Sequence, residues 1–170
     1  MIPFCLILGD STGVGTAGAL AREGIRCEIH AHVGARSSGV LEEWQGRITP
    51  AVALIALGSN DVGDPRLERR LIALRARTRA PRVTWLAPYN RTAALTVTKV
   101  ALRFGDKVIP LAQLPTRDGV HPTSYRPISG LLGWKLLSGF RKNVSPETRG
   151  AWPPEAANVP VRRAVVLQMQ

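Results

Sequence analysis

Five residues in this chain carry the groups that a serine nucleophile and its oxyanion hole require, and each follows a segment that we expect to be a strand. They are Ser11 after Gly9-Asp10, Gly34, Asn60 in Gly58-Ser59-Asn60-Asp61, and Asp118 and His121 in Asp118-Gly119-Val120-His121. Together they supply a hydroxyl, a backbone amide, a side-chain amide, a carboxylate and an imidazole. In a parallel α/β sheet the carboxyl ends of the strands meet at one edge, where ligands bind. The spacing therefore predicts one active site at that edge.

The chemistry begins with Ser11, which stands between an expected strand and an expected helix. The unpaired N–H groups of a first helical turn favour negative charge, so they stabilise the oxyanion formed when a serine hydroxyl attacks a carbonyl. An imidazole such as that of His121 is a suitable base near neutral pH. Asp118, three residues earlier, can reach that imidazole within a tight turn. Each short pattern alone also fits a helix cap or an ordinary turn, so the prediction depends on their occurrence together.

Gly34 and Asn60 complete the oxyanion hole in this prediction, with the Ser11 N–H as the third donor. Glycine allows a ligand to approach its backbone closely. Asn60 offers an uncharged N–H donor. The tetrapeptide around Asn60 is also typical of a turn.

Short apolar segments alternate with helical patterns along the first 140 residues. We expect strands at residues 2–8, 26–33, 51–57, 82–86 and 107–111. We expect helices at residues 12–22, 37–45, 92–104 and 124–140, with another that begins at Asp64-Pro65. Residues 51–57 include no polar side chain, as in a strand buried on both faces. Five strands alternating with helices predict an α/β fold with a parallel sheet and right-handed crossovers.

The polar blocks resemble those of the SGNH hydrolases, also called GDSL-type esterases and lipases. The family blocks Gly-Asp-Ser, Gly-x-Asn-Asp and Asp-x-x-His correspond to residues 9–11, 58–61 and 118–121, and the second-block glycine corresponds to Gly34. Thr12 stands where the GDSL signature has leucine. The resemblance covers residues 2–140 and implies a three-layer α/β/α sandwich with a flavodoxin-like, five-stranded parallel sheet.

The resemblance also implies a serine esterase that uses no cofactor and no metal. Ser11 is then the nucleophile, His121 the base and Asp118 the residue that orients His121. The Ser11 N–H, the Gly34 N–H and the Asn60 side chain form the oxyanion hole. The expected reaction is hydrolysis of a carboxylic ester through an acyl-serine, on a small molecule, a lipid or a glycan, with acetyl on a carbohydrate as one example.

We expect residues 1–140 to form the catalytic domain and residues 141–170, which include four prolines, to form an extension or arm that can dock on a protein partner. Two other function classes remain open. A non-catalytic binding or structural module could retain this fold. An acyltransferase could use the same residues and pass the acyl group to an alcohol.

Two further patterns suggest other sites. Gly13, Gly15 and Gly18 match the dinucleotide fingerprint G-x-G-x-x-G, but Asp10-Ser11-Thr12 intervene before the first glycine, where a tight turn is expected. His30 and His32 alternate on one face of a strand, as a metal pair would, yet no third ligand is apparent. Histidines of the core or of a strand end are the simpler interpretation.

Composition sets the remaining expectations. The formal net charge is +11, and arginine carries nearly all of it. This charge indicates either an arginine-rich surface that contacts polyanions or only an arginine-rich composition of the source genome. Cys5 and Cys27 show no metal-binding spacing and lie on the first two expected strands. We expect them to be buried free thiols, with a disulfide between them as the alternative. The start of the chain shows no basic segment before its apolar residues, and no apolar run is long enough to span a bilayer. We therefore expect a soluble protein, cytoplasmic by default.

Overall fold

The computed structural model describes residues 4–137. Its strands are β1 (Cys5–Gly9), β2 (Glu28–Ala31), β3 (Val52–Ala56), β4 (Val83–Ala87) and β5 (Lys107–Pro110). Its helices are α1 (Ser11–Arg22), α2 (Ser37–Glu43), α3 (Leu67–Arg77), α4 (Arg91–Arg103) and α5 (Arg126–Leu132), with a 3₁₀ turn, η1, at Leu111–Gln113. The alternation of strands and helices is as predicted. The expected extension at residues 141–170 lies outside the described residues.

The strands form one parallel sheet in the order β2-β1-β3-β4-β5. From β1 the chain passes to β2 on one side of it and then to β3 on the other side. Ligands bind at such a reversal of strand order in open α/β sheets. Three of the predicted blocks follow β1, β2 and β3, so this topology brings them to neighbouring strand ends.

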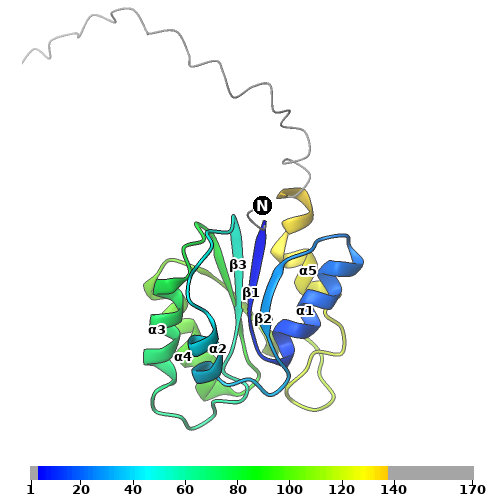
Figure 1. The fold of residues 1–170 in the computed structure, drawn as a ribbon. Coiled ribbons are helices and arrows are strands. Elements are labelled where there is room, and N and C mark those ends of the chain that lie inside the picture. Colours follow the sequence, from blue (N-terminus) through cyan, green and yellow to red (C-terminus); the bar gives the residue numbers. More distant parts are fainter. Residues whose placement is uncertain (1–3, 138–170) are drawn as a thin grey trace, which may run out of the picture.

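Helices cover both faces of the sheet, which gives the predicted three-layer α/β/α architecture (Figure 1). Helices α1 and α5 lie on one face, and α2, α3 and α4 lie on the other. Residues of β1 alternate between the two cores: Leu6 and Leu8 pack towards α2, α3 and α4, whereas Cys5 and Ile7 pack towards α1 and α5. Because both faces are covered, a central strand is apolar at every position.

The last predicted helix is interrupted. Helix α5 ends at Leu132 because Gly133 adopts a left-handed conformation with φ of +65°, a common way to end a helix. Helical backbone resumes at residues 134–137. Pro127 lies in the first turn of α5, as expected from its missing N–H. Among residues 4–137, no helix combines the length and the apolar character needed to cross a membrane.

Cys5 and Cys27 form a disulfide, so the prediction of free thiols was wrong. The parallel register pairs Leu6 with Glu28, which sets the two preceding residues opposite each other with Cα atoms 4.7 Å apart. A crosslink across this length of chain restricts the unfolded state and contributes about 3 kcal/mol to stability. Disulfides persist mainly in oxidising compartments, so this pair weighs against the cytoplasmic expectation.

Candidate active site

Ser11 is the first residue of α1, directly after β1. The helix is capped by Asp10, whose Oδ1 accepts hydrogen bonds from the Thr12 N–H (2.8 Å) and the Thr12 hydroxyl (2.7 Å). Ser11 is therefore not the residue that caps the helix, and its hydroxyl is free to face the sheet edge. Thr12, which replaces the leucine of the GDSL signature, strengthens this cap through its own hydroxyl.

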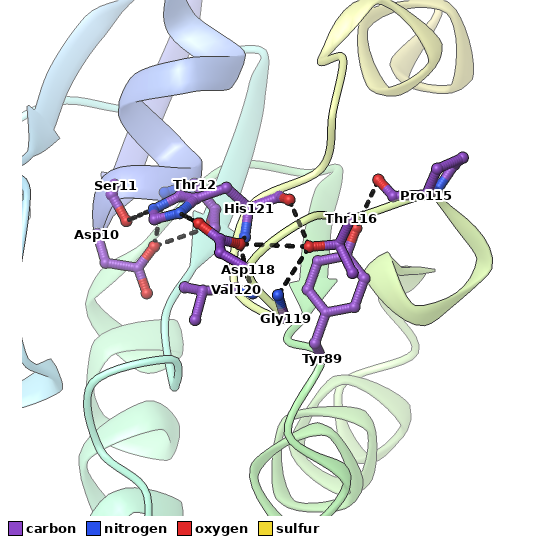
Figure 2. A network of polar contacts seen from close by, with 10 residues as sticks. All are labelled: Asp10, Ser11, Thr12, Tyr89, Pro115, Thr116, Asp118, Gly119, Val120 and His121. Atoms are coloured by element: carbon purple, nitrogen blue, oxygen red, sulfur yellow. Dashed lines mark hydrogen bonds and ion pairs between the residues drawn. The ribbon is translucent and has the colours of Figure 1, made fainter.

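Ser11, His121 and Asp118 form a continuous chain of hydrogen bonds (Figure 2). The Ser11 Oγ lies 2.8 Å from the His121 Nε2, although the two residues are 110 positions apart. On the other side of the ring, the His121 Nδ1 lies 2.7 Å from the Asp118 Oδ2. An ionised Asp118 accepts the Nδ1–H, so Nε2 is left as the acceptor for the serine hydroxyl.

The turn that carries Asp118 and His121 is held by its own polar groups. Asp118 Oδ1 accepts hydrogen bonds from the N–H groups of Val120 (2.9 Å) and His121 (2.7 Å). The Thr116 hydroxyl donates to the His121 carbonyl at 2.7 Å and accepts from the Gly119 N–H. The N–H and the imidazole of His121, with the Val120 N–H, hold the pKa of the Asp118 carboxyl well below its ordinary value. Asp118 therefore stays ionised behind the histidine. Thr116 was not singled out from the sequence, and only its position two residues before Asp118 hinted at its part in the turn.

Asn60 and Gly34 come from adjacent loops that are tied together. The Asn60 Nδ2 donates a hydrogen bond to the carbonyl of Ala35 at 3.0 Å. Ala35 is the residue that follows Gly34. Gly34 has a positive φ of +77°, and the space where a Cβ would stand is open. Since Nδ2 carries two hydrogens, one N–H of Asn60 remains for a ligand.

Asp61 holds the same two loops together, a role that the sequence analysis missed. Its buried carboxylate accepts hydrogen bonds from the Ser37 hydroxyl (2.8 Å) and the Ser37 N–H (3.1 Å). Asp61 thus supplies from another loop the cap that α2 lacks from its own N-cap residue, Arg36. This contact fixes the loop of Gly34 relative to the loop of Asn60.

Two glycines of the dinucleotide-like pattern, Gly13 and Gly15, allow close packing. A Cβ on Gly15 would lie 2.2 Å from the Cζ of Tyr125, so the tyrosine ring rests directly on the glycine backbone. A Cβ on Gly13 would meet the side chains of Ala31 and Ala56 at 3.3 and 3.4 Å. Protein atoms thus fill the space at these glycines that a pyrophosphate would need. Burial, with a smaller effect from the charge of Asp10, raises the pKa of Tyr125 to about 12.

Asp10 is a second buried ionisable group at this end of the sheet. It is fully shielded from solvent, and burial raises the pKa of its carboxyl despite the hydrogen bonds from Thr12. A carboxylate at a helix N-terminus is also favoured by the helix dipole. Asp10 therefore anchors the turn that presents Ser11.

His30 of β2 and His32, which follows this strand, bind carboxylates. His30 lies 2.7 Å from Glu43 and 3.0 Å from Glu28, and His32 lies 2.8 Å from Glu43. Burial lowers the pKa of His30, but its hydrogen bonds to Glu28 and Glu43, with their charges, outweigh this effect and raise it overall. Within residues 4–137, no group of three or more His, Cys, Asp and Glu side chains is arranged to hold a metal ion.

A cavity of about 300 Å³ opens beside the histidine. It is lined by Arg117, Asp118, His121, Pro122 and Thr123. Arg117 was not singled out from the sequence, although it directly precedes the Asp-x-x-His block. The cavity lies on the side of the site formed by this loop.

Comparisons with solved structures identify the fold. A carbohydrate acetylesterase from Sinorhizobium meliloti, Est24, superposes with a TM-score of 0.59 at 13% identity over 80% of this chain and 99% of its own. A protein assigned to the G-D-S-L family of lipolytic proteins, from Desulfitobacterium hafniense, gives 0.55 at 13% identity over 77% and 98%. The chain has the SGNH hydrolase fold. No protein-family model and no curated protein matches the sequence.

A third similar structure comes from a protein that is described as a transferase and not as an esterase. The catalytic domain of the peptidoglycan O-acetyltransferase OatA from Streptococcus pneumoniae gives a TM-score of 0.53 at 14% identity over 84% of this chain and 94% of its own. The SGNH fold therefore occurs in proteins described as esterases and in one described as an acyltransferase. At these identities the comparison establishes the fold, and the chemistry of this chain must be argued from its own residues.

Proposed function

We propose that this protein is a serine esterase that hydrolyses esters of short acyl groups. The observation that carries the proposal is the hydrogen-bonded chain Ser11–His121–Asp118 at the N-terminus of α1. Its arrangement matches the roles of nucleophile, base and orienting carboxylate. The similarity of the fold to esterases agrees with this assignment.

In the proposed reaction, the Ser11 Oγ attacks the ester carbonyl carbon while the His121 Nε2 takes the hydroxyl proton. The electron pair of the carbonyl moves to its oxygen, where the N–H groups of Ser11 and Gly34 and the Asn60 amide stabilise the charge. The tetrahedral intermediate then expels the alcohol, whose oxygen receives the proton from Nε2. The products of this half-reaction are an acyl-Ser11 and the free alcohol.

Water completes the cycle by the same steps. His121 takes a proton from water, the hydroxide attacks the acyl carbon, and Ser11 leaves with the proton restored. The Asp118 carboxylate stabilises the imidazolium in both halves. The side chains of His121 and Asp118 are 42% and 54% exposed, so water can reach the acyl-enzyme.

A small ester fits the size of the site. The cavity beside His121, about 300 Å³, is at the lower end of the range for small-molecule pockets. The similarity to a carbohydrate acetylesterase favours acetyl as the acyl group and a sugar as the alcohol.

Transfer of the acyl group to another alcohol is the second candidate. The similarity to an O-acetyltransferase domain favours it. The solvent exposure of His121 favours water as the acceptor, because an alcohol must compete with water at high concentration.

A fluorophosphonate probe tests the proposal directly, since it reacts only with an activated serine. We expect labelling at Ser11, loss of labelling in Ser11→Ala, and hydrolysis of 4-nitrophenyl acetate faster than of the decanoate. Incubation of the acyl-enzyme with glycerol then separates the acceptors, because an acyltransferase yields glycerol acetate in excess of acetate. If the protein is not labelled and hydrolyses neither of the two 4-nitrophenyl esters, the proposal fails and the protein is a binding module with the SGNH fold.

A further inference from the structure

Arg117 lines the cavity beside His121, the base of the proposed esterase. The cavity has a volume of about 300 Å³ and is also lined by His121, Pro122 and Thr123. Arg117 lies there because it directly precedes, in the sequence, the turn that holds Asp118 and His121. A positive group is thereby fixed next to the reacting residues.

The guanidinium of Arg117 forms no hydrogen bond or ion pair with any side chain or carbonyl of residues 4–137. Some arginines of this protein are engaged in ion pairs, as Arg70 is with Asp64 and Arg75 with Asp106. The one acidic neighbour of Arg117 in the cavity, Asp118, already accepts hydrogen bonds from Val120 and from His121. Arg117 therefore has its donors available for a ligand.

The chemistry of the proposed reaction decides which part of the ester reaches this cavity. The His121 Nε2 must protonate the oxygen of the departing alcohol, so the alcohol portion lies over the loop of His121. The carbonyl oxygen is directed instead towards the N–H donors of Gly34 and Asn60. The cavity at Arg117 is formed by the His121 loop, so it receives the alcohol portion.

We propose that Arg117 binds an anionic group on the alcohol portion of the ester, so that the substrates are short acyl esters of acidic alcohols, such as acidic sugars. The proposal rests on the esterase function proposed above. A planar guanidinium is suited to carboxylates and sulfates through paired hydrogen bonds. The charge of +11 on the whole chain draws such substrates towards the surface, and Arg117 supplies the contact at the site itself.

The test compares two esters with the same acyl group and similar size. One is 4-acetoxybenzoate, which is anionic, and the other is 4-acetoxybenzamide, which is neutral. The measured quantity is the ratio of kcat/KM for the anionic to the neutral ester, compared between variants, so that the different intrinsic reactivities of the two esters cancel. The variants are Arg117→Gln, Arg117→Lys and Arg69→Gln, an equal loss of charge at an exposed position on α3.

We expect Arg117→Gln to lower this ratio about 5- to 10-fold and to leave the neutral ester within about twofold. Arg117→Lys should retain part of the preference, and 0.5 M NaCl should reduce the ratio in the wild type, because salt screens an exposed contact. Arg69→Gln should leave the ratio within about twofold. Replacing the benzoate by 4-acetoxybenzenesulfonate shows whether the site also accepts a sulfonate.

An unchanged ratio in Arg117→Gln, or an equal decrease in Arg69→Gln, overturns the assignment of a local anion site. A parallel loss on both esters also overturns it, because it indicates a structural role. In each of these three outcomes, hydrolysis of the neutral ester by the wild type still supports the proposed esterase function. If the wild type hydrolyses neither ester, the proposed function fails and the anion site fails with it.

Discussion

The hydroxyl of Ser11 lies 2.8 Å from the Nε2 of His121, across 110 residues of sequence. Ser11 begins the helix that follows the central strand β1, and His121 lies in a loop that follows β5. We expect Ser11→Ala and His121→Ala each to lower kcat at least about 10³-fold on an acetyl ester, because each removes a group that the reaction needs. Steady-state kinetics on purified variants measures this loss.

The double variant Ser11→Ala/His121→Ala should be hardly slower than either single variant, since residues that act as a unit do not contribute additively. Ser38→Ala, a serine of α2 outside the hydrogen-bonded chain, is the matched control and should retain full turnover. Activity that survives in Ser11→Ala would mean that another group carries the reaction.

Asn60→Ala tests the oxyanion hole. We expect kcat to fall about 10²- to 10³-fold with little change in KM, because the amide stabilises charge that develops only in the transition state. Asn60 also bonds the Ala35 carbonyl, so stability must be measured alongside activity. The control is Asn90→Ala, which removes the N-cap of α4 and costs about 1 kcal/mol without affecting kcat. An Asn60→Ala variant with normal kcat contradicts this role.

Gly15→Ala tests the contact between α1 and α5. The added methyl group would overlap the ring of Tyr125, so we expect the free energy of unfolding to fall by about 1–3 kcal/mol. Gly18→Ala is the control on the same helix. Its Cβ would meet only the Arg22 Nη1, at 3.8 Å, and alanine favours helix by up to about 1 kcal/mol.

Urea denaturation measures both variants. Tyr125→Ala should cost less stability in the Gly15→Ala background than in the wild type, because removing the ring also removes the overlap. Equal stabilities of Gly15→Ala and Gly18→Ala would show that the ring does not rest on the glycine.

The contacts of His30 and Glu43 predict a pH-dependent stability. The pKa of His30 is raised from 6.5, so its stabilising effect is complete below pH 6.5 and is lost as the pH rises through the raised value. The pKa of Glu43 is lowered from 4.5, chiefly by its hydrogen bond to His30, so its effect is present above pH 4.5 and is lost as the pH falls through the lowered value. The pair is therefore most stabilising between pH 4.5 and 6.5.

Glu43→Gln removes this contribution. Because the pair is at the surface, we expect the difference in unfolding free energy from the wild type to be at most about 1 kcal/mol, larger at pH 5.5 than at pH 9. The exposed neighbour Glu42 provides the control, and Glu42→Gln should show no such trend. A difference that grows towards pH 9 would contradict the assignment.

Local patterns in the sequence were sufficient for the order of the helices and strands, and they pointed to the residues proposed for the site. The apolar segment of β3 reflects a strand that is buried on both faces. The spacing of Leu67, Leu71 and Leu74 in α3 reflects a helix that is buried on one face. Local patterns failed at Gly133, which ends α5 where the apolar spacing continues. A glycine inside a helical pattern does not reveal whether it will adopt a left-handed conformation.

Contacts between distant segments were decided by the tertiary structure. The pairing of Cys5 with Cys27 depends on the register of β1 and β2, and a shift of one residue would have separated the thiols. The cap that Asp61 provides for Ser37, and the position of Arg117 in the cavity beside His121, depend on the paths of loops.

The amino-acid sequence by itself determined which segments are buried strands and which polar groups follow them, because burial and strand geometry impose patterns that are local in the chain. Only the tertiary structure decided that a hydroxyl, an imidazole and a carboxylate meet within hydrogen-bond distance, because that depends on strand order, register and loop conformation acting together across more than a hundred residues.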